Sequence, residues 1–272
     1  MNRIASTFER LRRQSRGGLM PFLTGGFPDL ATTRLALPAM VQAGADIVEI
    51  GIPFSDPIAD GPVIAESMNR ALQAGVTPDG VLGAIASVRP SVDAGMLAMV
   101  SISIVDRIGA AAFVASCAAA GVDGLIVPDL DLDEAATLRH QCDDAGLTCT
   151  LLVAPNSTTE RISRIASLST GFVYVLARVG LTGESGRIPE DLADRIATVR
   201  SVTDLPVAVG FGISSAEQVA TVLASADAAI VGSAIVRRME AAAETGDART
   251  VATAAAETVA ALREGVEAAA AR

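Results

Sequence analysis

The stretch that decides the fold and the site is Val48-Glu49-Ile50-Gly51-Ile52-Pro53-Phe54-Ser55-Asp56-Pro57-Ile58-Ala59-Asp60-Gly61-Pro62. Glu49 is a carboxylate in a short apolar strand, where burial is costly unless it is compensated. Burial would also raise the pKa of Glu49 toward the range that proton transfer needs. Asp60 ends a loop that prolines restrict, and two carboxylates in different environments can divide acid and base roles. The residues alone equally allow a structural interpretation, in which Glu49 pairs with an arginine and Asp60 caps a helix.

Around this stretch the chain repeats one unit, a short apolar strand followed by a helix. The eight predicted strands cover residues 19–24, 45–50, 97–101, 124–127, 148–153, 171–177, 206–209 and 228–231. They are continuous apolar runs, as buried parallel strands are. Eight such units in 272 residues predict an α/β fold, a single (β/α)8 TIM barrel that forms one domain over residues 1–272. Extra helices are expected at the N-terminus (1–13), after strand two (63–74 and 78–88) and at the C-terminus (252–268).

The remaining helices are expected at residues 30–43, 110–120, 132–145, 159–168, 189–199 and 216–223, and from 234 onward. The helix at 189–199 is expected to carry its proline in the first turn.

Composition excludes several kinds of chemistry and of partner. The net charge is −10, which argues against nucleic acid and anionic membranes as partners. No apolar run has the length of a membrane helix, and the N-terminus lacks a secretory h-region.

All 21 basic residues are arginine, so Schiff-base chemistry on lysine is excluded. The single histidine, His140, is expected on an exposed helix face and leaves no His-rich metal site. We expect Cys117, Cys142 and Cys149 to be small buried hydrophobes in a reducing cytoplasm.

In a TIM barrel the active site forms from the loops after the strands, which is where Glu49 and Asp60 stand. This placement favours the functional interpretation of both carboxylates.

Glycine-rich loops follow strands six, seven and eight, and their backbone N–H groups predict a phosphate monoester site. The alternative is that these glycines only end strands tightly. Three aromatic side chains at strand ends suggest a flat apolar ligand, with core packing as the alternative: Phe22, Tyr174 and Phe211. Thr182 lies in a loop that could close as a lid between Gly180 and Gly183.

The fourteen positions from Glu49 to Pro62 resemble the signature of the tryptophan synthase α subunit. The resemblance also covers residues 21–29, 178–183, 210–214 and 231–236. It implies a single TIM barrel without cofactor or metal that cleaves indole-3-glycerol phosphate into indole and glyceraldehyde 3-phosphate. Glu49 would then move protons between the glycerol hydroxyl and carbon 3 of indole, and Asp60 would bind the indole N–H. The other implied substrate contacts are Phe22, Tyr174, Thr182, Gly183, Phe211, Gly212, Gly232 and Ser233.

The resemblance further implies a pyridoxal-phosphate β subunit as partner in an α2β2 assembly, with Asp56 and Pro57 on the docking surface. Two departures concern the surroundings of the site. Ser101-Ile102-Ser103 stands where family members usually have a tyrosine and an asparagine, which affects the support of Asp60. Asp129-Leu130-Asp131 replaces an Asp-x-Pro, which affects docking.

Other functions compatible with the sequence are a stand-alone lyase that releases free indole, a non-catalytic activator of the β subunit, and another phosphate-binding barrel such as a sugar-phosphate isomerase. The intact pair of Glu49 and Asp60 argues against the activator. The length of the signature argues against the isomerase.

Overall fold

The computed structural model describes residues 2–57, 60–177, 188–210 and 212–271. Its parallel strands form one sheet in the order β5-β4-β3-β2-β1-β9-β8-β7-β6. The strands are β1 (Gly18–Thr24), β2 (Ile47–Gly51), β3 (Gly95–Met99), β4 (Gly124–Ile126), β5 (Thr148–Thr150), β6 (Leu152–Val153), β7 (Val173–Leu176), β8 (Val207–Gly210) and β9 (Ala228–Val231). The predicted fifth strand is divided at Leu151 into β5 and β6, which stand at the two ends of the order. The sheet is therefore a nearly closed barrel, and the prediction of a TIM barrel is confirmed.

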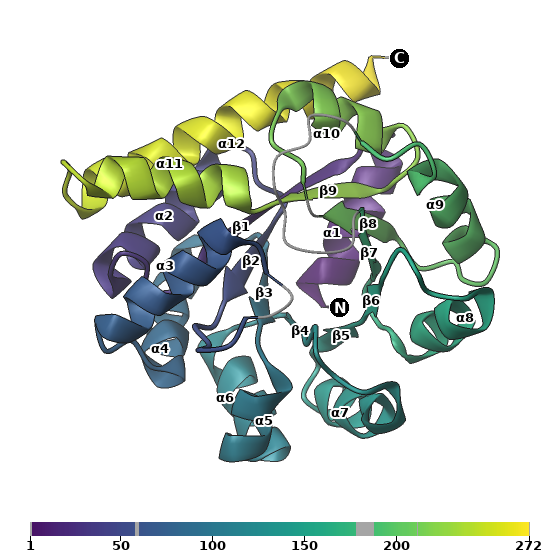
Figure 1. Cartoon of the computed structure of the whole chain (residues 1–272), viewed down its shortest axis with the longest axis horizontal. Helices are drawn as coiled ribbons and strands as arrows, with labels where there is room; N and C mark the ends of the chain where they lie inside the picture. Colours follow the sequence, from purple (N-terminus) through teal and green to yellow (C-terminus); the bar gives the residue numbers. More distant parts are fainter. Residues whose placement is uncertain (1, 58–59, 178–187, 211, 272) are drawn as a thin grey trace.

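The helices surround the barrel except for α1, which lies across its centre in the view of Figure 1. They are α1 (Arg3–Arg13), α2 (Leu30–Gln42), α3 (Pro62–Gln73), α4 (Pro78–Val88), the 3-10 turn η1 (Arg89–Ser91), α5 (Ile102–Ile108), α6 (Ala110–Ala120), α7 (Leu132–Asp144), α8 (Thr159–Leu168), α9 (Leu192–Arg200), α10 (Ala216–Leu223), α11 (Ser233–Ala243) and α12 (Ala248–Ala270). Within the described ranges, no single helix has both the length and the apolar composition to cross a membrane; α5 and α6 have both only when joined, across a 101° bend.

Several predicted boundaries were wrong and α5 was not predicted; the C-terminal helix, for example, was expected at 252–268 and is Ala248–Ala270. The third strand was expected to reach residue 101, because Val100, Ile102 and Ile104 alternate with serines as a strand would. The strand ends instead at Met99, and the Ser101 hydroxyl accepts the N–H of Ser103 and starts α5. A side-chain cap of this kind competes with strand pairing for the same backbone. The helix expected from residue 189 begins at Leu192, so Pro189 precedes it.

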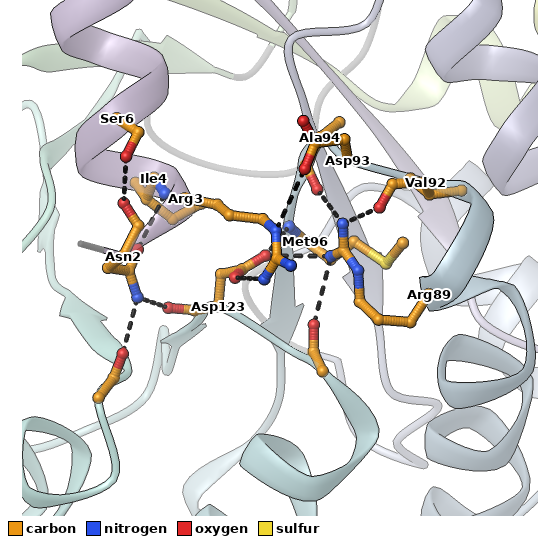
Figure 2. Close-up of polar contacts among 12 residues, drawn as sticks. Asn2, Arg3, Ile4, Ser6, Arg89, Val92, Asp93, Ala94, Met96 and Asp123 are labelled. Carbon is orange, nitrogen blue, oxygen red and sulfur yellow. Dashed lines mark hydrogen bonds and ion pairs between the residues drawn. The ribbon is translucent and has the colours of Figure 1, made fainter.

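Three aspartates anchor the face of the barrel where the strands begin. Each of them forms two hydrogen bonds with the backbone of one residue in the preceding strand. The aspartate N–H donates to the carbonyl of that residue, and the N–H of that residue donates to the aspartate carboxylate. The three are Asp46, Asp123 and Asp227. For Asp123 the partner is Met96, with an N–H to Oδ2 distance of 2.9 Å. Arg3 and Arg89 also bind this carboxylate, each at 3.2 Å, as Figure 2 shows. The charges of the buried Asp46 and Asp123 are thus paired and hydrogen-bonded, which is the condition for tolerating them in a core, whereas Asp227 is half-buried.

The remaining polar candidates of the sequence lie where they were expected. Cys117, Cys142 and Cys149 are buried free thiols, and burial raises the pKa of Cys117 to about 12. His140 is exposed on α7.

Candidate active site

Glu49 is the central carboxylate of the site. It lies in β2 and is only 1% exposed. In register with it stand Phe22 of β1 and Leu97 of β3, so apolar side chains flank it on both neighbouring strands. Burial, and secondarily the negative charge of Asp60, raise the pKa of Glu49 from 4.5 to about 8. At neutral pH Glu49 therefore holds a proton that it can donate.

Among residues 2–57, 60–177, 188–210 and 212–271, no arginine forms the ion pair considered for Glu49. Within the described residues, Oε2 of Glu49 is buried and has no hydrogen-bond partner. The arginines of the opposite face show what a satisfied arrangement looks like, because Arg16 binds both oxygens of Asp46 at 2.9 and 2.7 Å. A buried carboxylate oxygen without a partner destabilises the fold, and such groups concentrate at functional sites.

Asp60 is held by the loop and does not cap a helix. Its backbone N–H donates to the carbonyl of Pro57 at 3.0 Å. Helix α3 begins after Gly61 and has no side-chain cap, so the alternative role for Asp60 is not observed. Burial raises the pKa of Asp60 from 3.8 to about 6. The two carboxylates thus differ in pKa, and at neutral pH Asp60 is the charged one and Glu49 the protonated one.

Two of the predicted aromatic side chains lie beside the carboxylates. Tyr174 is 3% exposed in β7, and its pKa is raised well above its usual value by burial first and then by the charges of Glu49 and Asp60. Phe22 lies against Gly51 at one edge and Gly232 at the other. A Cβ on Gly51 would come within 2.7 Å of the Phe22 ring, and one on Gly232 within 3.4 Å. The ring of Phe22 therefore lies between the strand of Glu49 and the start of α11.

The predicted phosphate residues are placed in part. Gly232 precedes α11 and Ser233 begins it; both are half-buried, and no side chain caps this helix end. Its first N–H groups therefore have no side-chain acceptor and are available to an anion, as helix N-termini are. Gly212 is exposed and has a φ of 86°, a conformation that favours glycine. Thr182, Gly183 and Phe211 lie outside the described residues.

Asp56 and Pro57 stand at the rim of the site, in the loop after β2. Asp56 is exposed and accepts a hydrogen bond from the Ser55 hydroxyl at 2.6 Å. Both residues line a pocket that also contains Asp60, Ser101 and Asp129.

Sequence reasoning missed the pair of Ser101 and Asp129, because the two residues join only when the loops after β3 and β4 meet. The Ser101 hydroxyl donates to Oδ2 of Asp129 at 2.6 Å, and the N–H of Ile102 donates to Oδ1 at 2.9 Å. The departures from the family pattern at Ser101 and at Asp131 were visible, but the contact between Ser101 and Asp129 was not. Within the part of the chain that the structure describes, no cluster of three or more His, Cys, Asp or Glu side chains could hold a metal ion.

Comparison with known proteins gives a uniform result. The family model described as tryptophan synthase alpha chain matches residues 8–267. The tryptophan synthase alpha chain of Geobacter sulfurreducens is 42% identical over 98% of this chain and 99% of its own length. That of Acaryochloris marina is 45% identical over 88% of this chain and 90% of its own.

Solved structures agree with the sequences. A structure of Mycobacterium tuberculosis tryptophan synthase superposes with a TM-score of 0.88 at 35% identity, over 97% of this chain and 98% of the other. Tryptophan synthase subunit alpha from Legionella pneumophila gives a TM-score of 0.89 at 31% identity, over 98% and 99%. The matches cover the whole barrel and not only its signature loop, and they define a TIM-barrel enzyme of the carbon–carbon lyase class. The chain belongs to the tryptophan synthase alpha chain family, whose known reaction in tryptophan biosynthesis is the cleavage of indole-3-glycerol phosphate.

Proposed function

We propose that Glu49 is the acid–base and Asp60 the indole-binding carboxylate of an indole-3-glycerol phosphate lyase that acts with a β subunit. The observation that carries the assignment is the buried carboxylate of Glu49, with a pKa of about 8 and one oxygen without a partner. This state costs stability and gives Glu49 a proton at neutral pH. Neither feature is needed to hold the barrel together.

The two pKa values fit the two halves of the reaction. Glu49 donates its proton to carbon 3 of indole, which gives the indolenine tautomer. The carboxylate so formed accepts the proton of the glycerol hydroxyl, and the carbon–carbon bond then breaks to release indole and an aldehyde. The positive charge of the indolenine develops on the ring nitrogen, where the ionised Asp60, with a pKa of about 6, stabilises it. The cycle returns the proton to Glu49 without an external acid.

The surrounding residues supply orientation. Phe22 and Tyr174 flank the ring on opposite sides of the barrel mouth, since they come from β1 and β7. The N–H groups at Gly232 and Ser233 bind the phosphate together with Gly212, and we assign Thr182, Gly183 and Phe211 to the same substrate contacts. Local backbone donors explain how a chain with a net charge of −10 can hold a phosphate.

The β subunit is proposed as the partner because the relatives are named as one chain of tryptophan synthase. Asp56 and Pro57 are proposed to contact it, since they lie at the rim of the pocket that begins at Asp60. A loop fixed by a partner at Pro57 also fixes Asp60, because the N–H of Asp60 donates to the Pro57 carbonyl.

The test is the release of indole from indole-3-glycerol phosphate by the purified chain, with and without a β subunit from the same source. We expect weak release by the chain alone and a strong rise when the partner is added. Strong release that ignores the partner would identify a stand-alone lyase instead. Absence of indole in both reactions would contradict the assignment of Glu49 and Asp60.

A further inference from the structure

A pocket adjoins Asp60 and does not extend to Glu49. Asp60 lines it, whereas Glu49, Phe22 and Tyr174 do not. The space that the centre of a water-sized sphere can occupy is about 40 Å³. A water molecule needs about 10–15 Å³ on this measure, and a methyl group is of similar size, so the pocket has room for one small group. Its apolar wall comes from the loop after β2, from α3 and from the ends of β3 and β4: Ile52, Phe54, Met68, Met99, Val100 and Pro128.

The chemistry of indole relates this pocket to one position of the ring. The nitrogen has two ring neighbours: carbon 2, which leads to the reacting carbon 3, and carbon 7a, which leads to carbon 7. Glu49 acts at carbon 3, so the carbon 2 side of the nitrogen faces Glu49. A pocket that is lined by Asp60 but not by Glu49 then lies on the carbon 7 side.

We propose that this pocket receives a substituent at carbon 7 of the indole ring, so that the chain accepts substrates with a small apolar group at that position. The inference rests on the proposed binding of the indole N–H by Asp60. Val100, which is 2% exposed, is one of the lining residues and the one we choose for changing the size of the pocket. It continues the strand ladder through its N–H, which donates to the carbonyl of Ile126 at 3.0 Å, so its backbone is fixed and its side chain length determines the space.

The polar groups of the pocket restrict the kind of substituent. Asp56, Asp60 and Asp129 line it, and its lining contains no basic side chain. An anionic substituent is therefore repelled. Both oxygens of Asp129 already accept hydrogen bonds, from Ser101 and from the N–H of Ile102. This end of the pocket is held in place, and the apolar wall in front of it suits a methyl group or a halogen.

The experiment measures the reverse reaction, the condensation of ring-methylated indoles with glyceraldehyde 3-phosphate by the purified chain. The quantity is kcat/KM for 7-methylindole relative to indole, with 4-methylindole as an isomer of equal size and polarity. Val100→Leu narrows the pocket and Val100→Ala widens it. Val202→Ala is the matched control, since Val202 is 37% exposed at the end of α9. One methylene in an apolar pocket changes kcat/KM by about tenfold or more.

We expect kcat/KM for 7-methylindole, relative to indole, to fall about tenfold in Val100→Leu and to be unchanged or higher in Val100→Ala. The same ratio for 4-methylindole should not change in either variant, and neither ratio should change in Val202→Ala. A 7-methyl ratio that neither variant moves would overturn the inference, and so would equal changes for the two isomers. Both results would leave the proposed function intact, because indole itself would still react. Failure of the wild-type chain to condense indole would overturn the proposed function and the inference together.

Discussion

Glu49→Gln is expected to make the protein more stable at alkaline pH while it removes the activity. In the folded chain the pKa of Glu49 is about 8, against an ordinary value of 4.5. Because the folded state holds the proton more tightly than the unfolded chain, the favourable contribution of Glu49 is fully present below pH 4.5. It is lost as the pH rises to about 8. Each pKa unit corresponds to about 1.4 kcal/mol, so the full loss is about 5 kcal/mol.

Glutamine resembles the protonated carboxyl group and does not titrate. At pH 5 the free energies of unfolding of the variant and of the wild-type chain should therefore differ by about 1 kcal/mol at most. Between pH 5 and pH 9 the free energy of unfolding of the variant, relative to that of the wild-type chain, should rise by about 4 kcal/mol. Turnover should fall by about 100- to 10,000-fold at every pH, as expected for a lost acid–base group.

The assay is urea unfolding at pH 5 and pH 9, with the free energy in water obtained by linear extrapolation. Glu66→Gln is the matched control, because Glu66 lies exposed on α3 and its substitution should have a similar effect at the two pH values. A stability difference for Glu49→Gln that is equal at pH 5 and pH 9 would refute the reasoning, since it would mean that Glu49 is ionised in the folded protein. Normal turnover in the variant would refute its role in proton transfer.

Two further predictions follow from the same structure. The rate of indole release should be highest between about pH 6 and pH 8, where Asp60 is ionised and Glu49 protonated; Asp60→Asn should lower the rate and remove the acidic limb of the profile but not the alkaline one. Loss of both limbs in that variant would speak against separate roles. Asp123→Asn should lower the free energy of unfolding by about 3 to 5 kcal/mol, because it leaves the charges of Arg3 and Arg89 without their buried partner. The same change at the fully exposed Asp93 should cost less than about 0.5 kcal/mol, and equal losses in the two variants, measured by urea unfolding, would contradict this account.

Strand positions were predictable because each strand is a buried apolar run, and burial on both faces leaves a strong signal in sequence. The run at residues 148–153 was found as one strand, although the barrel divides it at Leu151. Helix α5 was missed because Ser101, which caps it, and Ser103 alternate with apolar residues. The choice between a strand and a capped helix depended on the Ser101 hydroxyl. A single side-chain cap of this kind determines where a helix begins, and it leaves little hydrophobic periodicity in the sequence from which to predict it.

The residues of the candidate site were likewise predictable only in part. Glu49 could be singled out because a carboxylate in an apolar strand is anomalous by itself, and Asp60 because it lies in the loop after the same strand, where barrels place their active sites. The Ser101–Asp129 pair could not, since neither residue is anomalous where it stands in the sequence and their contact joins two loops. The pocket beside Val100 likewise belongs to several segments. Sequence therefore identifies residues that conflict with their local surroundings, and structure adds those whose role arises from a neighbour distant in the chain.

Buried carboxylates have hydrogen-bond and ion-pair partners at one end of the barrel and lack them at the other, and this difference supports the proposed function. At the end where the strands begin, Asp46, Asp123 and Asp227 are each bound by backbone N–H groups and by arginine. At the other end, Glu49 has neither an arginine partner among the described residues nor a bond to Oε2. The buried Asp46 and Asp123 are thus paired where they serve stability. Glu49, buried at the strand ends where barrels carry out their chemistry, has no such pairing among the described residues, and this supports the proposal that it transfers a proton.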